Sequence, residues 1–415
     1  MKTTCLKSEN GSVLLATMIF VLAVAGFLSM YLWTIQNSDQ QVARAQTWNA
    51  TLPVAEAGIE EGLADVNFNI GTSLSNSIAS LSPLSHSING GTYHVNFYGG
   101  AAPYIISTGI MTAPITGAAI SRAVKVVIQK QGLFTKGLVA LDYINMNGNS
   151  IASSSWNSMD PLESSNGLFI GFSGTNGDIA AVYGYVSLGN QTIKGSLYLG
   201  PAATYDGSGT ILGQIYYDAN LNYPNVTLPT TDSSGNPIIW TPAPTINIGT
   251  VSSPVWEHDF TVPGNYTVSD SLPVVVEPGV NVTMDIQQVD WKPNLVNING
   301  GTTNSGNAVL YIESGTITMG GNSSGGASAN QPKNLFVFGL PDVTSVTFSG
   351  TSTFNGVVYA PEANMTLNGG GDSYDLIGAY VVNTLTMNGH YDFHYDTSLS
   401  LYYNSGYVVG SWQEL

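Results

Sequence analysis

The sequence predicts an α+β protein with three successive parts: a long N-terminal helix, transmembrane and then amphipathic, a small antiparallel sheet, and a large all-β body. Three observations predict this order. Residues 12–33 form an apolar run without a charged side chain. Residues 69–136 hold short runs of alternating apolar and polar residues, which is the period of a strand. From residue 137 onward no helical period is found, and Gly, Asn and Ser interrupt short apolar runs.

The composition excludes several classes of protein. The 415 residues carry 27 acidic and 10 basic side chains, a net charge of −17, and 43% are hydrophobic. This apolar content argues against intrinsic disorder, and the shortage of Lys and Arg argues against nucleic-acid binding, which needs clustered cations. The single cysteine, Cys5, excludes a disulfide scaffold and a Cys-rich metal site.

The acidity is concentrated in the second part of the chain. Residues 12–136 contain five basic and five acidic side chains, whereas residues 137–415 contain three lysines, no arginine and 21 carboxylates. We therefore expect a domain boundary near residue 136, with an acidic domain over residues 137–415.

The run at residues 12–33 is long enough, at about 1.5 Å per residue, to cross the hydrocarbon core of a bilayer. Residues 1–11 carry Lys2 and Lys7, a positive flank that stays in the cytoplasm. The sequence has no second run of this kind, so we expect one crossing with residues 34–415 outside the cytoplasm.

The helix is predicted to continue beyond the membrane to residue 68. Apolar or small residues recur there every three or four positions, which is the period of one helical face. Pro53 is expected to kink this helix, and Gly58 and Gly62 leave a groove for a neighbouring element. The residues of the predicted stripe are Ile35, Val42, Ala45, Trp48, Leu52, Ala55, Ile59, Leu63 and Val66.

A short basic leader that ends in Gly11, followed by an apolar segment running into an amphipathic helix, resembles the type IV pilin-like proteins. The stretch 54–61 (VAEAGIEE) is similar to an Ala- and Glu-rich patch that minor pilins often carry. The resemblance implies cleavage by a prepilin peptidase between Gly11 and Ser12, and lateral packing of the apolar helix in a filament.

The sequence departs from the family pattern at two positions. The family usually has a bulky apolar first residue where this chain has Ser12, and major pilins have a glutamate where this chain has Ala16. Loss of this carboxylate is tolerated in minor pilins and in the large pseudopilin of type II secretion, so the resemblance implies a minor rather than a major subunit. A secretory signal cleaved after residues 23–25 (AVA) is the rival interpretation, although the apolar run continues past Ala25.

Strands are predicted near residues 91–99, 104–109 and 122–130, where they would cover the helix in the manner of a pilin head. His94 falls on the polar side of its strand, and we expect a solvated histidine rather than a metal ligand.

In the acidic domain, Asn-Gly pairs such as those that begin at residues 147, 299, 355, 368 and 388 mark turns between short strands. We favour a β-helix, or solenoid, over a sandwich. Residues 228–247, rich in Pro and Thr, are expected to form an excursion. The stretches 354–361 and 393–396 resemble an uncharacterised β-solenoid-like domain of surface proteins with pilin-like amino termini, and this likeness implies no activity.

The sequence offers weak candidates for catalysis. A lyase acting on acidic polysaccharide would need a basic residue as proton acceptor and cations to attract its substrate, and this domain has only three lysines and no arginine. A glycoside hydrolase needs two close carboxylates, but solvated carboxylates in turns are the favoured interpretation. The candidate pairs are Glu257 with Asp259, Asp285 with Asp290, and Asp372 with Asp375.

Metal sites are not expected. The stretches 206–209 (DGSG) and 232–236 (DSSGN) have the composition of calcium loops but lack their ligand spacing, so Asx turns are favoured. On a strand His390 and His394 would lie about 13 Å apart, too far to share a zinc ion.

The sequence therefore predicts a non-enzymatic minor pilin or pseudopilin-like subunit with no cofactor, whose β-rich domain serves adhesion or capping. Its expected partners are other pilin-like subunits, the membrane, a prepilin peptidase and surface glycans, with no nucleic acid. It would lie in the cytoplasmic membrane before assembly and on an extracellular filament or the cell surface afterwards. The alternative is a tethered or secreted cell-surface β-helix protein that binds or hydrolyses carbohydrate.

Amino-terminal sequencing of the mature protein distinguishes the two routes. We expect the mature chain to begin at Ser12, because prepilin peptidase would cleave after Gly11. A mature chain that begins at Gly26 would instead indicate an ordinary secretory signal.

Overall fold

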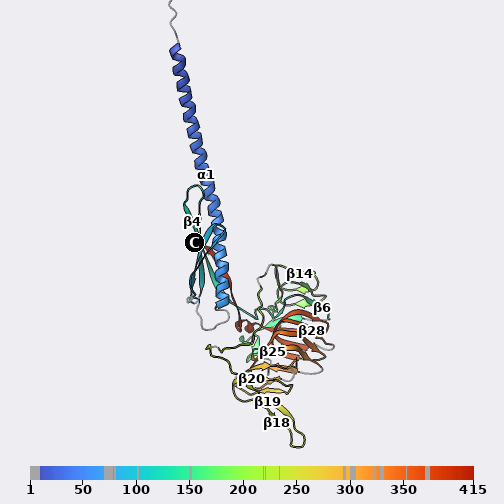
Figure 1. The fold of residues 1–415 in the computed structure, drawn as a ribbon. Coiled ribbons are helices and arrows are strands. Elements are labelled where there is room, and N and C mark those ends of the chain that lie inside the picture. The colour runs from blue at the N-terminus through green and yellow to red at the C-terminus, as the bar shows by residue number, and fades with distance from the viewer. Residues whose placement is uncertain are drawn as a thin grey trace, which may run out of the picture. The chain divides into compact units, whose positions relative to one another are not determined.

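The computed structural model describes residues 10–69, 78, 81–100, 102–148, 152–217, 219, 221–232, 234–292, 296–299, 305–320, 324–327, 331–351, 353–369 and 374–415. One long apolar helix is followed by a large, mostly β body (Figure 1). Contacts divide the chain into two units. The first comprises residues 1–129 and 407–415, and the second, here called the body, comprises residues 130–406.

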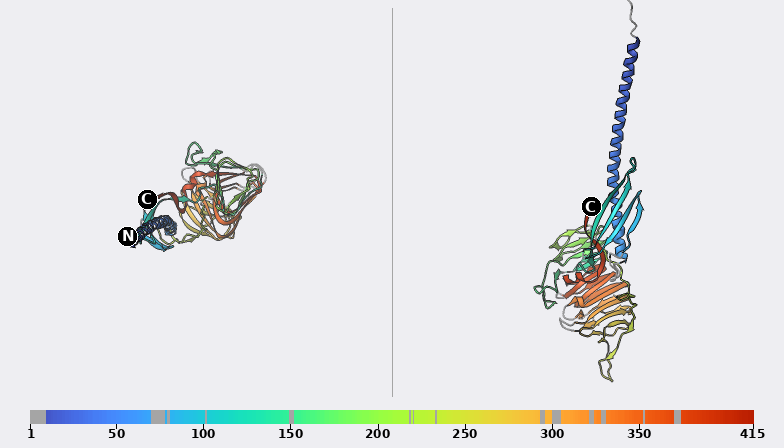
Figure 2. Two further views of the ribbon diagram at one scale, coloured as in Figure 1. Left: turned by 90° about the horizontal axis from the view of Figure 1, so that it is seen from above. Right: turned by 90° about the vertical axis from the view of Figure 1, so that its left-hand side faces the viewer.

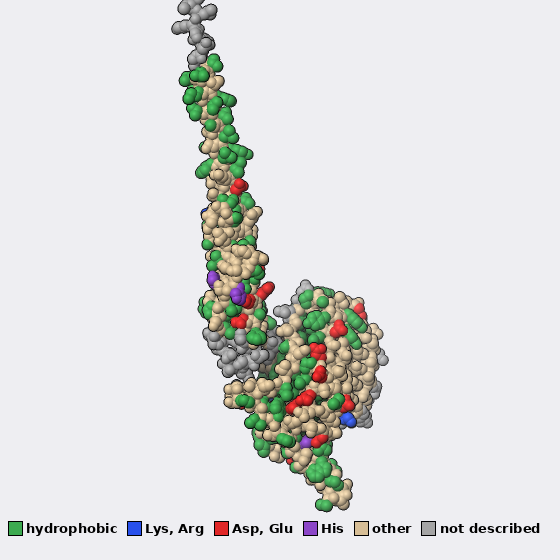
Figure 3. Space-filling view, in the orientation of Figure 1, with side chains coloured by type: hydrophobic (Ala, Val, Ile, Leu, Met, Phe, Trp, Pro, Cys, Tyr) green, Lys and Arg blue, Asp and Glu red, His purple; other side chains and the backbone are tan. Residues whose placement is uncertain are grey.

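The helix α1 (Asn10–Asn69) is a single element that runs through Pro53. Every side chain from Val13 to Trp33 is exposed, and no part of this stretch is buried within the protein (Figure 3). By length and composition α1 could cross a membrane, which is compatible with a membrane anchor or a signal sequence.

Beyond the membrane-length segment, α1 packs one face on the small sheet, and the predicted stripe is wrong in its first half. Val42 and Trp48 remain 51% and 49% exposed. The buried face is rotated toward smaller residues, and the hydroxyls of buried Thr47 and Thr51 donate to carbonyl oxygens four residues earlier. The buried positions are Ala43, Thr47, Thr51, Val54, Ala55, Gly58, Ile59, Gly62 and Val66.

Close approach of the sheet explains this rotation. A Cβ atom on Gly109 would lie 2.7 Å from the Thr51 carbonyl oxygen and from the Ala55 backbone nitrogen. The predicted groove at Gly58 and Gly62 is filled by the sheet itself, since added Cβ atoms there would meet side chains of the second and third strands.

The small sheet has five strands in the order β1-β2-β3-β4-β31, and β1 to β4 pair antiparallel. Buried Tyr93, Val95, Ile105, Val124 and Val126 form one apolar cluster with the buried face of α1, while His94 is exposed as predicted. The strands are β1 (Leu84–Ile88), β2 (Gly91–Tyr98), β3 (Tyr104–Thr112), β4 (Ala119–Gly132) and β31 (Asn404–Glu414).

The last strand was not foreseen, because residues 137–415 were assigned to one domain. In the structure β31 is a neighbour of β4, so the body is an insertion between two adjacent strands. Arg122 forms an ion pair with Glu414 at 2.6 Å. The Asn67 side chain also exchanges two hydrogen bonds with the Tyr407 backbone. The sequence could not predict these contacts, since their members lie about 300 residues apart.

The first half of the body contains short strands. They are β5 (Leu138–Ala140), β6 (Ile144–Met146), β7 (Ala152–Trp156), β8 (Ser164–Ser165), β9 (Leu168–Phe169), β10 (Ile179–Ala181), β11 (Tyr185–Ser187), β12 (Thr192–Ile193), β13 (Leu197–Leu199), β14 (Thr204–Tyr205), β15 (Thr210–Ile211) and β16 (Ile215–Tyr216).

The second half contains longer ones and two 3₁₀ turns. They are β17 (Thr241–Pro242), β18 (Ile246–Asn247), β19 (Trp256–Phe260), β20 (Gly264–Val268), β21 (Val274–Val276), β22 (Asn281–Ile286), β23 (Asp290–Trp291), β24 (Val296–Ile298), β25 (Asn307–Met319), β26 (Ser324–Ala327), η4 (Pro332–Asn334), β27 (Leu335–Ser349), β28 (Thr353–Asn368), β29 (Tyr374–Met387), β30 (Tyr391–Asp396) and η5 (Thr397–Leu401).

Parallel pairing connects these strands into one series. Its hydrogen-bonded order is β16-β13-β10-β5-β29-β28-β27-β25-β22-β20-β17, and we call it the parallel series. The chain therefore enters at β5, in the middle, builds to β16, crosses to β17 at the other end, and returns to β29 beside β5. Antiparallel pairs occur only between β8 and β9 and between β18 and β19 among the pairings of the body's described strands.

The crossing from β16 to β17 corresponds to the excursion predicted at residues 228–247, but it begins earlier. No strand lies between residues 217 and 240 in the part of this segment that the structure describes. The Tyr359 hydroxyl donates to the Pro224 carbonyl oxygen at 2.7 Å and fastens the crossing to β28. Inward side chains of the parallel series fill one continuous apolar core.

Replacing Gly109 with alanine should loosen the sheet from α1. The added methyl group would collide with helix backbone that cannot rotate away, and such overpacking costs about 1–3 kcal/mol. Hydrogen exchange of the β3 amides in the full-length mature protein should therefore accelerate by about tenfold or more. Gly26→Ala is the control, since no atom lies within 4 Å of its Cβ position. Equal protection of β3 in both variants would contradict this packing.

Candidate functional site

The first candidate surface lies on α1. It comprises the exposed side chains of residues 13–33 together with exposed Ile35, Val42 and Trp48, and we call it the apolar helix surface. Figure 3 shows apolar side chains along the described length of this segment. Arg122 lies over the Trp48 ring at 5.0 Å and donates to the Trp48 carbonyl oxygen. The surface thus reaches from the membrane-length segment to the edge of the small sheet.

The predicted processing residues lie at the start of this surface. Gly11 and Ser12 belong to the first turn of α1, ahead of Val13, and Ala16 is exposed. Cys5, Lys2 and Lys7 lie outside the described residues.

The Ala- and Glu-rich patch at residues 54–61 splits between two environments. Its apolar members face the sheet, and Glu60 is exposed. Glu61 accepts a hydrogen bond from the Tyr93 hydroxyl at 2.5 Å and lies 2.7 Å from His86. The Tyr93 hydrogen bond holds the pKa of Glu61 below its ordinary value, and the same bond raises the pKa of Tyr93 to about 12. These contacts tie the helix to β1 and β2, which is a structural role.

The carboxylate candidates on β19 share a face, as their spacing predicted. Glu257 and Asp259 are both half-buried on the outer side, while His258 points inward. Burial, and then the charge of Glu277, which directly follows the neighbouring strand β21, raises the pKa of Asp259. His258 lies 2.8 Å from the Pro244 carbonyl oxygen and from Asp270, so it fastens the chain around β19.

Asp285 has a different neighbour from the one predicted. Asp290 accepts from Thr316 at 2.7 Å, whereas Asp285 is buried and lies beside Glu313 on the neighbouring strand β25. Burial, and then the charge of Asp285, raises the pKa of Glu313. The pair forms across strands rather than along one. For the third candidate, Asp372 lies outside the described residues, as does the side chain of Asp375.

The two calcium-like stretches form turns closed by their own aspartates. Asp206 accepts from the Ser208 backbone, and Asp232 accepts from the backbones of Ser234 and Asn236. These bonds are the favoured Asx-turn geometry. His394 contacts Ser154 at 2.7 Å and packs on Phe169. Within the described ranges, no group of three His, Cys, Asp or Glu is placed to hold a metal ion.

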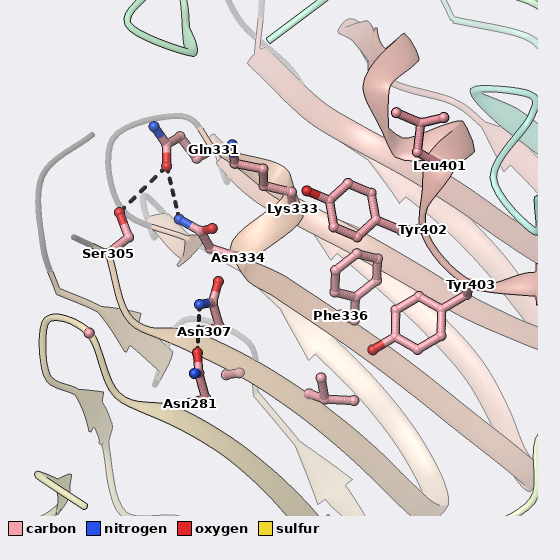
Figure 4. Close-up of a pocket in the computed structure, with 13 residues that line it drawn as sticks. Asn281, Ser305, Asn307, Gln331, Lys333, Asn334, Phe336, Leu401, Tyr402 and Tyr403 are labelled. Atoms are coloured by element: carbon pink, nitrogen blue, oxygen red, sulfur yellow. Dashed lines mark hydrogen bonds between the residues drawn. The ribbon is translucent and has the colours of Figure 1, made fainter. Parts of the chain in front are cut away.

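The second candidate surface is a cavity of about 760 Å³ in the body, which we call the amide–tyrosine cavity (Figure 4). The starts of β22, β25 and β27, the turn η4 with the residue before it, and the end of η5 with the two residues after it supply its walls. Amide side chains line one part, and aromatic side chains line the other. The residues used below are Asn281, Asn307, Gln331, Asn334, Phe336, Tyr402 and Tyr403.

Sequence reasoning missed this cavity. Asn281 and Asn307 are register partners on β22 and β25, with a 2.7 Å bond between their side chains. The recurrent asparagines were a signal, but the irregular spacing of the strands hid which of them become neighbours.

Comparison with known proteins gives one family match. A model described as "Domain of unknown function (DUF7305)" matches residues 257–402, and these residues include most of the cavity lining. The chain matches no curated protein and no solved structure.

Replacing Glu313 with glutamine should stabilise the body at neutral pH. A carboxyl whose pKa is raised in the folded state contributes stability below its unfolded pKa and loses it as pH rises through the folded pKa. We expect the free energy of unfolding in urea to rise by about 0.5 kcal/mol at pH 7, with the gain vanishing near pH 4. Glu362→Gln, at an exposed position of β28, controls for loss of one negative charge. An equal gain in both variants would rule out a specific Asp285–Glu313 repulsion.

Proposed function

We propose that this protein is a minor pilin or pseudopilin-like subunit of a type IV pilus or type II secretion-like filament. The apolar helix surface is the observation that carries the proposal. Its side chains from Val13 to Trp33 contact nothing else within the described chain, so other molecules must cover them. Lipid would cover this segment before assembly, and neighbouring pilin-like helices would cover it in the filament.

The exposed residues beyond the membrane-length segment favour helical partners over lipid alone. Ile35, Val42 and Trp48 continue the surface about 20 Å further along the helix axis. A simple lipid anchor would not need them. The small sheet buries Ala43 and Thr47 on the other side of these turns and leaves Val42 exposed, and Trp48 lies at the edge of the sheet beside Arg122.

We further propose that the body is a β-helix displayed for adhesion or capping and without catalytic activity. Three sets of parallel pairs support this reading, since β5, β6 and β7 pair with β10, β11 and β12, and all three continue in the same order onto β13, β14 and β15. Viewed from above, the strands of the body lie over one another (Figure 2). A body of this size suits a minor or terminal subunit better than one repeated along a thin fibre.

The proposal includes cleavage by a prepilin peptidase between Gly11 and Ser12, then passage from the cytoplasmic membrane to the filament or cell surface. A tethered or secreted β-helix protein that binds or hydrolyses carbohydrate is the alternative. It would be monomeric, and its apolar helix surface would contact lipid alone or be removed with a signal.

Photo-crosslinking from the apolar helix surface tests the proposal. With benzoylphenylalanine in place of Phe20, irradiation of the producing cells should give adducts to other pilin-like subunits, because neighbouring helices would lie against this position. The adducts should be found by mass spectrometry in the sheared filament fraction, and they should disappear when prepilin peptidase is deleted.

The control carries the same photoreactive residue at Leu212, an exposed position of the body. Adducts to pilin-like subunits from Phe20 and none from Leu212 would support helix packing. Lipid adducts alone from Phe20, in a chain that has been cleaved and exported, would overturn the filament proposal.

A further inference from the structure

We propose that the amide–tyrosine cavity binds a neutral oligosaccharide. The inference deepens the display role proposed for the body by naming its ligand class. The cavity volume of about 760 Å³ falls within the range of small-molecule sites, about 300–1,000 Å³.

The polar wall is built from amides held in fixed positions. Gln331 and Asn334 are only 2% and 4% exposed, and the Asn334 amide donates to the Gln331 side-chain oxygen at 3.0 Å. Figure 4 shows these side chains next to the Asn281–Asn307 pair. An amide offers two donors and an acceptor with two lone pairs, so the single bond between exposed Asn281 and Asn307 leaves both able to bind a ligand.

The aromatic wall is held by packing and backbone contacts. Tyr403 has a φ of 50°, uncommon for a residue other than glycine, and its carbonyl oxygen accepts from the Leu133 backbone at 2.7 Å. Its ring lies 4.7 Å from that of buried Phe336, and burial raises its pKa. Tyr403 therefore anchors the wall. Half-buried Tyr402, whose ring lies 5.8 Å from Phe336, presents an aromatic surface and a hydroxyl at the cavity.

The charge of the lining selects against other ligands. Among the described residues that line it, none is a carboxylate and Lys333 is the one charged member, although residues 137–415 contain 21 carboxylates. A divalent cation would need carboxylate ligands. An anionic ligand would meet one lysine in a strongly acidic domain. An apolar ligand would displace water from the exposed amides of Asn281 and Asn307 without replacing its hydrogen bonds.

Neutral sugars satisfy both walls. Their hydroxyl groups both donate and accept hydrogen bonds, as amides do, and the apolar faces of their rings can stack on an aromatic side chain. The combination of Asn281 and Asn307 with Tyr402 is therefore suited to a sugar that bridges the amide and aromatic walls.

Binding should be measured on the full-length mature protein in a detergent without a sugar headgroup, because maltoside detergents would compete for the cavity. The probes are maltotetraose, cellotetraose, mannotetraose and chitotetraose, with tetragalacturonate as the anionic comparison. We expect saturation-transfer NMR and calorimetry to detect at least one neutral tetrasaccharide, with Tyr402→Ala and Asn307→Ala each raising Kd by tenfold or more.

Two matched variants control for general effects. Asn388→Ala removes a similar exposed amide bond between neighbouring strands, to Asn368, and Tyr183→Ala removes an exposed tyrosine outside the cavity lining. Both should leave Kd unchanged. If Tyr402→Ala fails to fold, Asn307→Ala carries the test, since its side chain is exposed.

Absence of binding by all four neutral probes would overturn the inference. So would binding that is insensitive to both cavity variants, or a preference for tetragalacturonate. The assay does not depend on assembly, so a protein that binds sugar but gives no helix crosslinks would lose the filament proposal and retain this site.

Discussion

The uncovered apolar surface of α1 is the constraint on which the architecture depends. An apolar helix exposed on all sides from Val13 to Trp33 is unfavourable in water. Lipid or other proteins must therefore supply the apolar contacts that the chain itself does not provide. The same helix changes character beyond this segment, where Thr47, Thr51 and two glycines bring the small sheet close to its backbone. One helix thus has a face committed to its own sheet and another left for partners.

In the body, the parallel register between strands decides which side chains become neighbours. Because partners such as Asn281 and Asn307 come from successive strands, like side chains meet across strands, which produces both favourable and unfavourable neighbours. Asn281 and Asn307 form a hydrogen-bonded pair of amides, whereas the charge of Asp285 disfavours the ionised form of Glu313. The amide–tyrosine cavity lies where the amide pairs adjoin Tyr402 and Tyr403, the two residues that follow η5.

Local sequence patterns predicted where the main helix and several strands lie. They could not predict contacts between residues that are far apart in the sequence. The apolar run and its continuation placed the helix at residues 12–68, against Asn10–Asn69 in the structure, and alternation placed buried Val124 and Val126 correctly. The buried face of the helix was misplaced because Gly109, which decides it, lies on a strand far along the sequence. The cavity was missed for the same reason, since the register between β22 and β25 depends on loops of irregular length.

The insertion of the body between β4 and β31 has a mechanical consequence. Because the two strands are neighbours in one sheet, a pull on the body is shared between two covalent connections, which a backbone hydrogen bond from Leu133 to Tyr403 joins. For β31 to leave the sheet and the helix, the Arg122–Glu414 ion pair and the two Asn67–Tyr407 hydrogen bonds would have to break. A domain attached through two neighbouring strands should therefore resist a larger pulling force than a domain attached through one terminal strand.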